Sequence, residues 1–372
     1  MESRLFKPIK LRNLELANRI IVSPMCQYSA TDGTASDWHM MHLGQFAVSG
    51  VGLLLTEATG VVPEGRISPN CLGLYSDENE TALSRIVKFI HEYGNSPIGI
   101  QIAHAGRKAS TEPPWKGQSA VLPEDGGWEL VAPSAISFSN QSEIPKAMTK
   151  EHIGHAQEGF VQATKRAKRL DIDCIEIHAA HGYLAQSFLS PLSNKREDEY
   201  GGSLENRMRF LLETFEKVRA VWPKEKPLGV RITSSDWVDG GWEIGDSVAL
   251  ALELEKRGCD FIVASSGGAT PDAPVIAGPG YQVGFAAEIK RNMTDMAVMA
   301  VGLITDPHQA ESIIRSGQAD MVALARGMLF NPHWTWQAAV ALGQEVAYPN
   351  QYFRCHPDML GSSVPGKLPD TK

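Results

Sequence analysis

The sequence predicts a single (β/α)8 TIM barrel, and two observations lead to this fold class. Eight short apolar runs rich in Val and Ile recur along the 372 residues, and their continuous apolar character suits parallel strands that are buried on both faces. Each run is followed by a longer segment with helical periodicity, which is the alternation that this barrel requires. An open doubly wound sheet is the alternative, but no G-x-G-x-x-G motif follows the first run, so its dinucleotide-binding form has no support.

The expected strands and helices alternate along the chain. The strands are residues 19–25, 52–59, 98–104, 174–179, 228–233, 261–267, 297–302 and 321–326. The clearest helices are residues 77–92, 149–170, 203–221, 245–257 and 306–316. Thr149, Ser203 and Asp306 begin three of these helices, because their side-chain oxygens can accept a hydrogen bond from the first free backbone N–H groups. Pro307 at the first helical position supports the last of them.

The chain is longer than the roughly 250 residues of a plain barrel. Most of the surplus is an insert after the third strand, at about 105–148, and the rest is a C-terminal arm at about 343–372. The insert is rich in Pro, Gly and Trp, so we expect loops that include a hairpin, placed over the barrel mouth. Residues 1–372 are expected to form one domain, with 361–372 as a mobile end.

Composition excludes several functions. The formal net charge of -8, from 35 Lys and Arg against 43 Asp and Glu, argues against nucleic acid or an anionic membrane as the main partner. No apolar run approaches the roughly 20 residues that span a bilayer, and the charged start does not resemble a secretory signal, so we expect a cytoplasmic protein. The five cysteines are scattered and form no C-x-x-C pair, so the sequence predicts neither a disulfide framework nor a metal site.

The active site of this fold lies at the C-terminal ends of the strands. The residues found there are Pro24, Met25, Cys26, Ala58, Gln101, His104, His178, His181, Arg231, Ser265, Gly302 and Arg326. No lysine ends a strand, which weakens a Schiff-base aldolase. His178, His181 and the nearby Tyr183 could donate hydrogen bonds to a carbonyl oxygen or a developing enolate. Equally, the histidines could be polar mouth residues bonded to their neighbours.

Two arginines and one cysteine at the strand ends also indicate a ligand. This fold often holds a phosphate after its last two strands, where Gly302 and Arg326 stand. Arg231 lies inside an apolar strand and needs a partner, for which an anionic ligand is the economical choice. The sequence leaves two roles for Cys26, as a small buried hydrophobic residue or as a functional thiol.

Five sequence blocks together carry a resemblance to a known family. They are SPMCQY at 23–28, EATGVVPEGRIS at 57–68, IQIAHAGRKAS at 100–110, EIHAAHGYLAQSFLSPLSNKREDEYGGSLENR at 176–207, and the late AVGLIT and LARGML turns. In this order they resemble the Old Yellow Enzyme family of flavin-dependent ene-reductases, in its bacterial, thermophilic-like branch that includes the xenobiotic reductases. The segment HAAHGYL is the most specific of these matches.

The resemblance implies FMN across the barrel mouth, with NADPH or NADH as the reductant. The residues implied to contact the isoalloxazine are Ser23, Pro24, Met25, Cys26, Ala58, Gln101 and Arg231, with Cys26 near the flavin N5 and Arg231 at the N1/C2 side. Gly302, Ala325 and Arg326 would hold the phosphate. A cation beside N1 stabilises the anionic reduced flavin.

The implied reaction is a ping-pong reduction of an activated C=C bond in an enone, enal, maleimide or nitro compound. NAD(P)H would reduce the flavin at N5, and the hydride would then pass to the substrate Cβ. His178 and His181 would bind the substrate oxygen with help from Tyr28, and Tyr183 would protonate Cα. The resemblance also implies a homodimer or homotetramer in which Arg354 reaches a neighbouring site, although the chain continues past Arg354 for longer than the family pattern suggests.

Two other function classes stay open from the sequence. A metal-dependent hydrolase or aldolase could use His178 and His181 with His104 and Glu176, and would be colourless and sensitive to a chelator. A non-catalytic flavin-binding protein would hold flavin that does not turn over.

Overall fold

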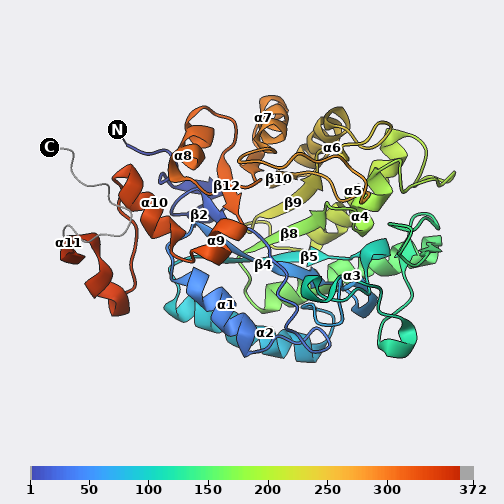
Figure 1. Ribbon diagram of the computed structural model, residues 1–372, viewed down its shortest axis with the longest axis horizontal. Coiled ribbons are helices and arrows are strands. Elements are labelled where there is room, and N and C mark those ends of the chain that lie inside the picture. The colour runs from blue at the N-terminus through green and yellow to red at the C-terminus, as the bar shows by residue number, and fades with distance from the viewer. Residues whose placement is uncertain (1, 361–372) are drawn as a thin grey trace.

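Eight parallel strands close into a barrel in the computed structural model, which describes residues 2–360 (Figure 1). They are β3 (Ile20–Val22), β4 (Leu53–Gly60), β5 (Ile98–Ala103), β8 (Cys174–Ala179), β9 (Leu228–Thr233), β10 (Phe261–Ser265), β11 (Ala297–Ala300) and β12 (Met321–Leu324). Each strand pairs in parallel with the next one along the chain, and β12 pairs with β3 to close the ring. The predicted (β/α)8 barrel is confirmed.

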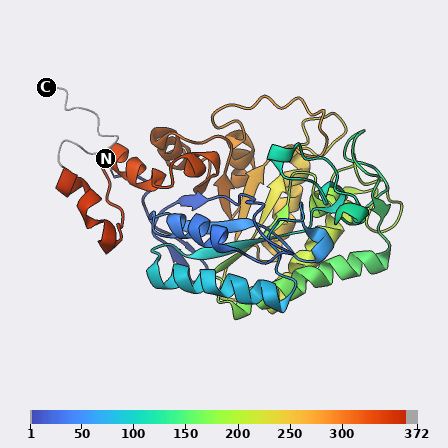
Figure 2. The same ribbon diagram turned by 60° about the horizontal axis from the view of Figure 1, so that its bottom comes forward.

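Helices surround the barrel (Figures 1 and 2). They are α1 (Asp37–Ala47), α2 (Asp77–Tyr93), α3 (Lys150–Arg169), α4 (Leu184–Leu189), α5 (Leu204–Val221), α6 (Ile244–Lys256), α7 (Val283–Asn292), α8 (Pro307–Arg315), α9 (Arg326–Phe330) and α10 (Trp334–Leu342). The five predicted helices are present. Thr149, Ser203 and Asp306 each accept a hydrogen bond from the backbone N–H three residues later, so the predicted N-caps are confirmed.

The sequence interpretation missed α1, and the reason is physical. The buried face of α1 includes His39, His42 and Gly44 beside Leu43 and Phe46. Histidine and glycine do not register as apolar positions, so the helical period of 3.6 residues is hidden. The burial is nevertheless that of a helix packed against the barrel, next to β4.

Five strands end earlier than their apolar runs. β3, β5, β10, β11 and β12 end at Val22, Ala103, Ser265, Ala300 and Leu324, whereas the predicted runs reach residues 25, 104, 267, 302 and 326. The remaining residues of each run lie at the C-terminal edge of the sheet. Among them, Ser23, Gly302 and Ala325 line the site described below.

An N-terminal pair of strands closes the opposite end of the barrel, and it was not predicted. β1 (Ile9–Leu11) and β2 (Leu14–Leu16) are antiparallel. Leu11 and Leu16 pack with Ile21 and Phe261 in the barrel interior. Close packing there also explains Gly229, because a Cβ at this position would lie 2.3 Å from the ring of Phe261. The interior at this end is therefore a filled core.

The insert and the arm differ in how they meet the barrel. The insert pairs β6 (Val131–Ala132) with β7 (Lys146–Ala147) in parallel, so these two strands do not form a hairpin. The expected hairpin corresponds to the antiparallel bridge between Thr111 and Ala120. Its Trp115 contacts Tyr28 edge-on, with ring centroids 5.5 Å apart. The arm, with η5 (Asn350–Cys355) and α11 (Pro357–Leu360), lies outside the barrel beyond α10 (Figures 1 and 2). The predicted mobile end at 361–372 falls outside the described residues.

No helix within residues 2–360 is both long and apolar enough to cross a membrane. The expectation of a cytoplasmic location is not tested further by the fold.

Candidate active site

A cavity of about 240 Å³ opens at the C-terminal edge of the barrel. The predicted cofactor residues that line it are Ser23, Arg231, Gly302, Ala325 and Arg326. They come from the ends of three strands, β3, β9 and β12, and from the turn after β11, so the fold gathers residues that are distant in sequence. Gly302 has a φ of 118°, a left-handed conformation that favours glycine. His181 lies on the rim of the same cavity.

The end of β8 and the loop that follows it bring His178, His181 and Tyr183 together. The ring centroids of His178 and His181 are 5.2 Å apart, and those of His178 and Tyr183 are 4.9 Å apart. The backbone N–H of Ala180 donates to Nδ1 of His178 at 3.1 Å, so the neutral ring carries its hydrogen on Nε2. Among the described residues Nε2 of His178 has no hydrogen-bond acceptor, which leaves this N–H for a ligand.

His181 is held in place by its neighbours on β9 and β10. Its backbone has a φ of 61°, in the left-handed region. Its N–H donates to Oγ1 of Thr233 at 2.8 Å, and its Nε2 lies 2.7 Å from Oγ of Ser265. Burial, followed by the nearby charge of Arg231, holds the pKa of both His178 and His181 well below the usual range. Both rings are therefore neutral hydrogen-bonding groups at neutral pH.

Lys108 is a site residue that the sequence interpretation missed. It lies in the turn after β5, and its Nζ donates to the carbonyl oxygens of His181 at 2.7 Å and Gly268 at 3.0 Å. Burial lowers the pKa of Lys108 to about 7. Its ammonium group is also 5.2 Å from the centre of the Tyr183 ring. The lysine in the block AHAGRKAS could have indicated this role, because a side chain five residues after a barrel strand can still reach the mouth.

Arg231 and Glu176 lie in the barrel interior beneath the mouth. Arg231 donates to Oγ of Ser23 at 3.0 Å, while Glu176 accepts a hydrogen bond from Gln101 at 2.6 Å. Nε of Arg231 and Oε2 of Glu176 are buried and have no partner within the described chain. An anionic or carbonyl-bearing ligand would supply the missing acceptor for the buried Arg231 guanidinium.

The carboxyl of Glu176 predicts a pH-dependent stability. Burial raises its pKa to about 7, so between its ordinary pKa of about 4.3 and pH 7 the folded protein holds a proton that the unfolded chain has lost. Stability then falls as pH rises through this window. Glu176→Gln removes this effect, so its melting temperature relative to the wild type should be higher at pH 7.5 than at pH 5. The surface variant Glu158→Gln should differ from the wild type equally at both pH values; equal differences for Glu176→Gln would mean that this carboxyl ionises normally.

The other half of the mouth is apolar and holds more of the predicted residues. Cys26, Tyr28 and Tyr183 pack against a small buried cluster that includes Ala58 and Cys71. Burial raises the pKa of Tyr183 well above its usual value, so its phenol stays protonated. Pro24 is partly buried in the same segment, and Met25 packs against the main core.

The structure does not assemble the metal site that the sequence left open. His104, His178, His181 and Glu176 do not form a metal-ligand cluster within residues 2–360, where the only such group is Cys26, Glu57 and Cys71. Nδ1 of His104 accepts a hydrogen bond from Gly106, and burial lowers its pKa to about 4. Arg354 is exposed on the arm and does not line the cavity of its own chain.

A closed (β/α)8 barrel with a polar, glycine-containing cavity at its C-terminal edge, next to two neutral histidines and a tyrosine, has the arrangement of an enzyme active site. Comparison with known proteins gives the class. Residues 4–345 match the NADH:flavin oxidoreductase / NADH oxidase family. The NADPH dehydrogenase of Geobacillus sp. (strain WCH70) is 46% identical over 356 residues, which cover 95% of this chain and 99% of that protein.

Solved structures agree in fold. Morphinone reductase in complex with tetrahydroNAD has a TM-score of 0.77 at 26% identity, over 94% of each chain. 2-Naphthoyl-CoA reductase in complex with 2-naphthoyl-CoA has a TM-score of 0.82 at 24% identity over 92% of this chain, a likeness of fold alone, and this chain spans 52% of that protein.

The chain therefore belongs to the NADH:flavin oxidoreductase family, the Old Yellow Enzyme family, and is close to the bacterial NADPH dehydrogenases. The predicted family, barrel fold and class of flavin oxidoreductase are confirmed. The roles of individual residues, the domain boundaries and the oligomeric state stay predictions.

Proposed function

We propose that this enzyme uses FMN and NAD(P)H to reduce the activated C=C bond of α,β-unsaturated carbonyl compounds. The observation that carries the proposal is the close position of His178, His181 and Tyr183 at the end of β8, with His181 lining the same cavity as Ser23 and Arg231. The first three residues suit a substrate whose oxygen gains negative charge. The cavity suits an extended ligand that ends in a phosphate.

The residues of the mouth fit FMN. The unpartnered Nε of Arg231 is buried beneath the mouth and would meet the N1/C2 side of the ring system, with Gln101 beside it. Ser23, Pro24, Met25, Cys26 and Ala58 would border the ring, and Gly302, Ala325 and Arg326 would hold the phosphate. When bound, FMN supplies a two-electron carrier that takes a hydride from NAD(P)H and gives one to Cβ of the substrate.

The two histidines would bind the substrate oxygen as hydrogen-bond donors. Nε2 of His178 carries its hydrogen, as shown above. For His181, the hydroxyl of Ser265 lies 2.7 Å from Nε2 and 3.4 Å from Oε1 of Gln282, and it can donate to either atom. When Ser265 donates to Nε2, Nδ1 of His181 carries the hydrogen and becomes the second donor. Preorganised donors of this kind each contribute about 3 kcal/mol when charge develops on the bound oxygen.

Tyr183 would protonate Cα, and this assignment predicts a separation of the two half-reactions. A positioned general acid typically contributes about 10²-fold or more. Tyr183→Phe should therefore slow substrate reduction by pre-reduced enzyme by roughly 100-fold, while NADPH should reduce the enzyme at nearly the normal rate. Stopped-flow absorbance measures both steps, and the exposed Tyr93→Phe serves as the control. Equal rates of substrate reduction in Tyr183→Phe and the wild type would remove Tyr183 as the proton donor.

The reductant and substrate class are tested by initial rates with NADPH and 2-cyclohexenone in the presence of excess EDTA. A ping-pong enzyme that releases the oxidised nicotinamide before the enone binds gives parallel double-reciprocal lines. Loss of activity in EDTA would instead favour a metal-dependent reaction. Comparison of NADH with NADPH under the same conditions determines which nicotinamide is preferred.

Arg354 is proposed to complete the site of a neighbouring copy. Its place on an exposed arm outside the barrel, away from its own cavity, supports this assignment (Figure 1). The resulting assembly would be a homodimer or homotetramer.

A further inference from the structure

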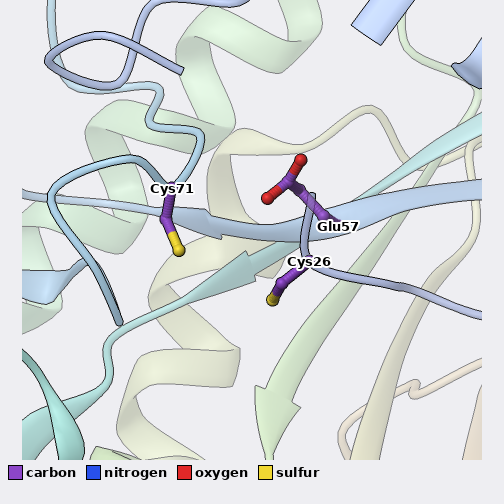
Figure 3. Close-up of side chains that lie close together, drawn as sticks. All are labelled: Cys26, Glu57 and Cys71. Carbon is purple, nitrogen blue, oxygen red and sulfur yellow. The ribbon is translucent and has the colours of Figure 1, made fainter. Parts of the chain in front are cut away.

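Three side chains come together beside the mouth, and one of them, Cys26, also belongs to the residues proposed to border the flavin ring. Cys26 follows β3, Glu57 lies in β4 and Cys71 follows β4, and Figure 3 shows the three side chains close together. One ligand atom from each of the three lies within 4.8 Å of the other two. The pairing of β4 with β5 shifts register between Leu55 and Ala58, and such an irregularity re-aims the side chains within it. This shift directs Glu57 toward the two thiols.

Two polar groups lie behind Glu57, and one of them, the backbone N–H of Gln27, donates a hydrogen bond to its carboxyl group. The backbone N–H of Ser36 donates to Nδ1 of His39 at 3.0 Å, so the neutral ring carries its hydrogen on Nε2. That Nε2 lies 3.2 Å from Oε1 of Glu57, and the backbone N–H of Gln27 donates to Oε2 at 3.2 Å. His39 and Glu57 are both buried. Metal-binding carboxylates are typically oriented in this way by a histidine or backbone group behind them.

We propose that Cys26, Glu57 and Cys71 form a binding site for a thiophilic divalent cation, with Zn²⁺ as the representative ion. Two thiolates and one carboxylate are ligands that zinc accepts, and a fourth position would stay open to water or a ligand at the mouth. Binding converts two thiols to thiolates and releases two protons, with no oxidation or reduction. Affinity should therefore increase with pH.

The geometry favours metal binding over a disulfide between Cys26 and Cys71. A disulfide uses only the two sulfur atoms, which must approach to about 2.05 Å, and leaves the convergence of Glu57 unexplained. A metal ion requires a smaller approach of the ligand atoms, because each zinc–sulfur bond is about 2.3 Å long and the two sulfur atoms stay apart from each other.

Of the two thiols, that of Cys26 is the one nearer to solvent. Cys26 is partly exposed and packs beside Tyr28 and Tyr183, whereas Cys71 is fully buried. An ion entering past Cys26 would hold this thiol in a fixed position at the edge of the proposed substrate pocket. Bound zinc should therefore inhibit the enzyme.

The test measures zinc on the holoenzyme, independently of catalysis. Protein that has been reduced and freed of metal is titrated with Zn²⁺ against a chromogenic chelator, and bound zinc is counted by atomic absorption after desalting. Cys71→Ser and Cys26→Ser each remove one ligand, while Cys355→Ser removes a thiol of the arm. We expect one zinc ion per chain in the wild type and in Cys355→Ser, and at least about 100-fold weaker binding in the other two, since loss of even an orienting group costs 10 to 100-fold.

Alkylation of Cys26 by iodoacetamide, followed by mass spectrometry, locates the ion. Zinc should protect Cys26 in the wild type and leave it unprotected in Cys71→Ser. Two outcomes overturn the proposal: stoichiometric zinc that persists in both Cys71→Ser and Cys26→Ser, or alkylation of Cys26 that zinc does not slow. Because neither readout needs turnover, failure of the ene-reductase assignment would leave this test intact.

Discussion

His178→Ala is expected to slow the reduction of 2-cyclohexenone by pre-reduced enzyme by roughly 100-fold or more, the usual loss for one donor to a developing oxyanion. This expectation rests on the tautomer of His178. The backbone N–H of Ala180 donates to Nδ1 of His178, so the ring hydrogen is on Nε2 and can be donated to the ligand. The enzyme is reduced with dithionite beforehand, so that only the reaction with the enone is observed in the stopped flow.

The double variant His178→Ala with His181→Ala extends this prediction to binding. A phenol bound through its oxygen over oxidised flavin gives long-wavelength charge-transfer absorption, and the double variant should lose this band. His308→Ala, an exposed histidine on α8, is the matched control and should retain both the band and the rate. An unchanged band in the double variant would place the oxygen-binding site elsewhere.

Arg231→Gln is expected to lower the midpoint potential of the bound flavin by about 30 to 60 mV. A hydrogen bond to a charged group contributes about 1.5–3 kcal/mol, and about 1.4 kcal/mol corresponds to 30 mV for a two-electron couple. The cation favours the anionic reduced flavin, so its loss makes reduction harder. The charge of Arg231 also favours the ionised form of the buried Glu176 carboxyl. An ionised Glu176 in Arg231→Gln would lower the flavin potential further, whereas a protonated Glu176 would not.

The potential is measured by equilibration with a dye of known potential during slow enzymatic reduction. Arg291→Gln, which removes an exposed guanidinium paired with Glu288, is the control and should leave the potential unchanged. A potential that rises or stays constant in Arg231→Gln would place this cation away from the N1 side of the ring.

The sequence predicted the barrel and the residues at which its strands begin, because apolar runs and N-cap residues are local signals. Arg231 and Gly302 could be assigned to the mouth from strand position alone, and both line the cavity. The helix α1 was missed because its buried face uses histidines, one of which supports Glu57. Lys108 was missed because it lies beyond the strand end, in a turn whose path depends on tertiary packing.

The cluster of Cys26, Glu57 and Cys71 could not be predicted from spacing. Its cysteines follow different strands, and Glu57 reaches them through a register shift in β4 that no local motif announces. Conversely, the pair of His178 and His181 resembles a metal motif in sequence, but its third and fourth candidate ligands do not join it in the described part of the chain. Proximity set by the barrel, rather than sequence spacing, decides which of the two groups is assembled.

The most direct test of the central claim is a visible absorption spectrum of the purified protein, recorded anaerobically, then after NADPH, and then after 2-cyclohexenone. The account predicts flavin bands that bleach with NADPH and return with the enone, which shows the cofactor and both half-reactions in one sample. Flavin bands that bleach but do not return would contradict the proposed substrate class. A colourless protein that remains inert after FMN is added would contradict the account as a whole.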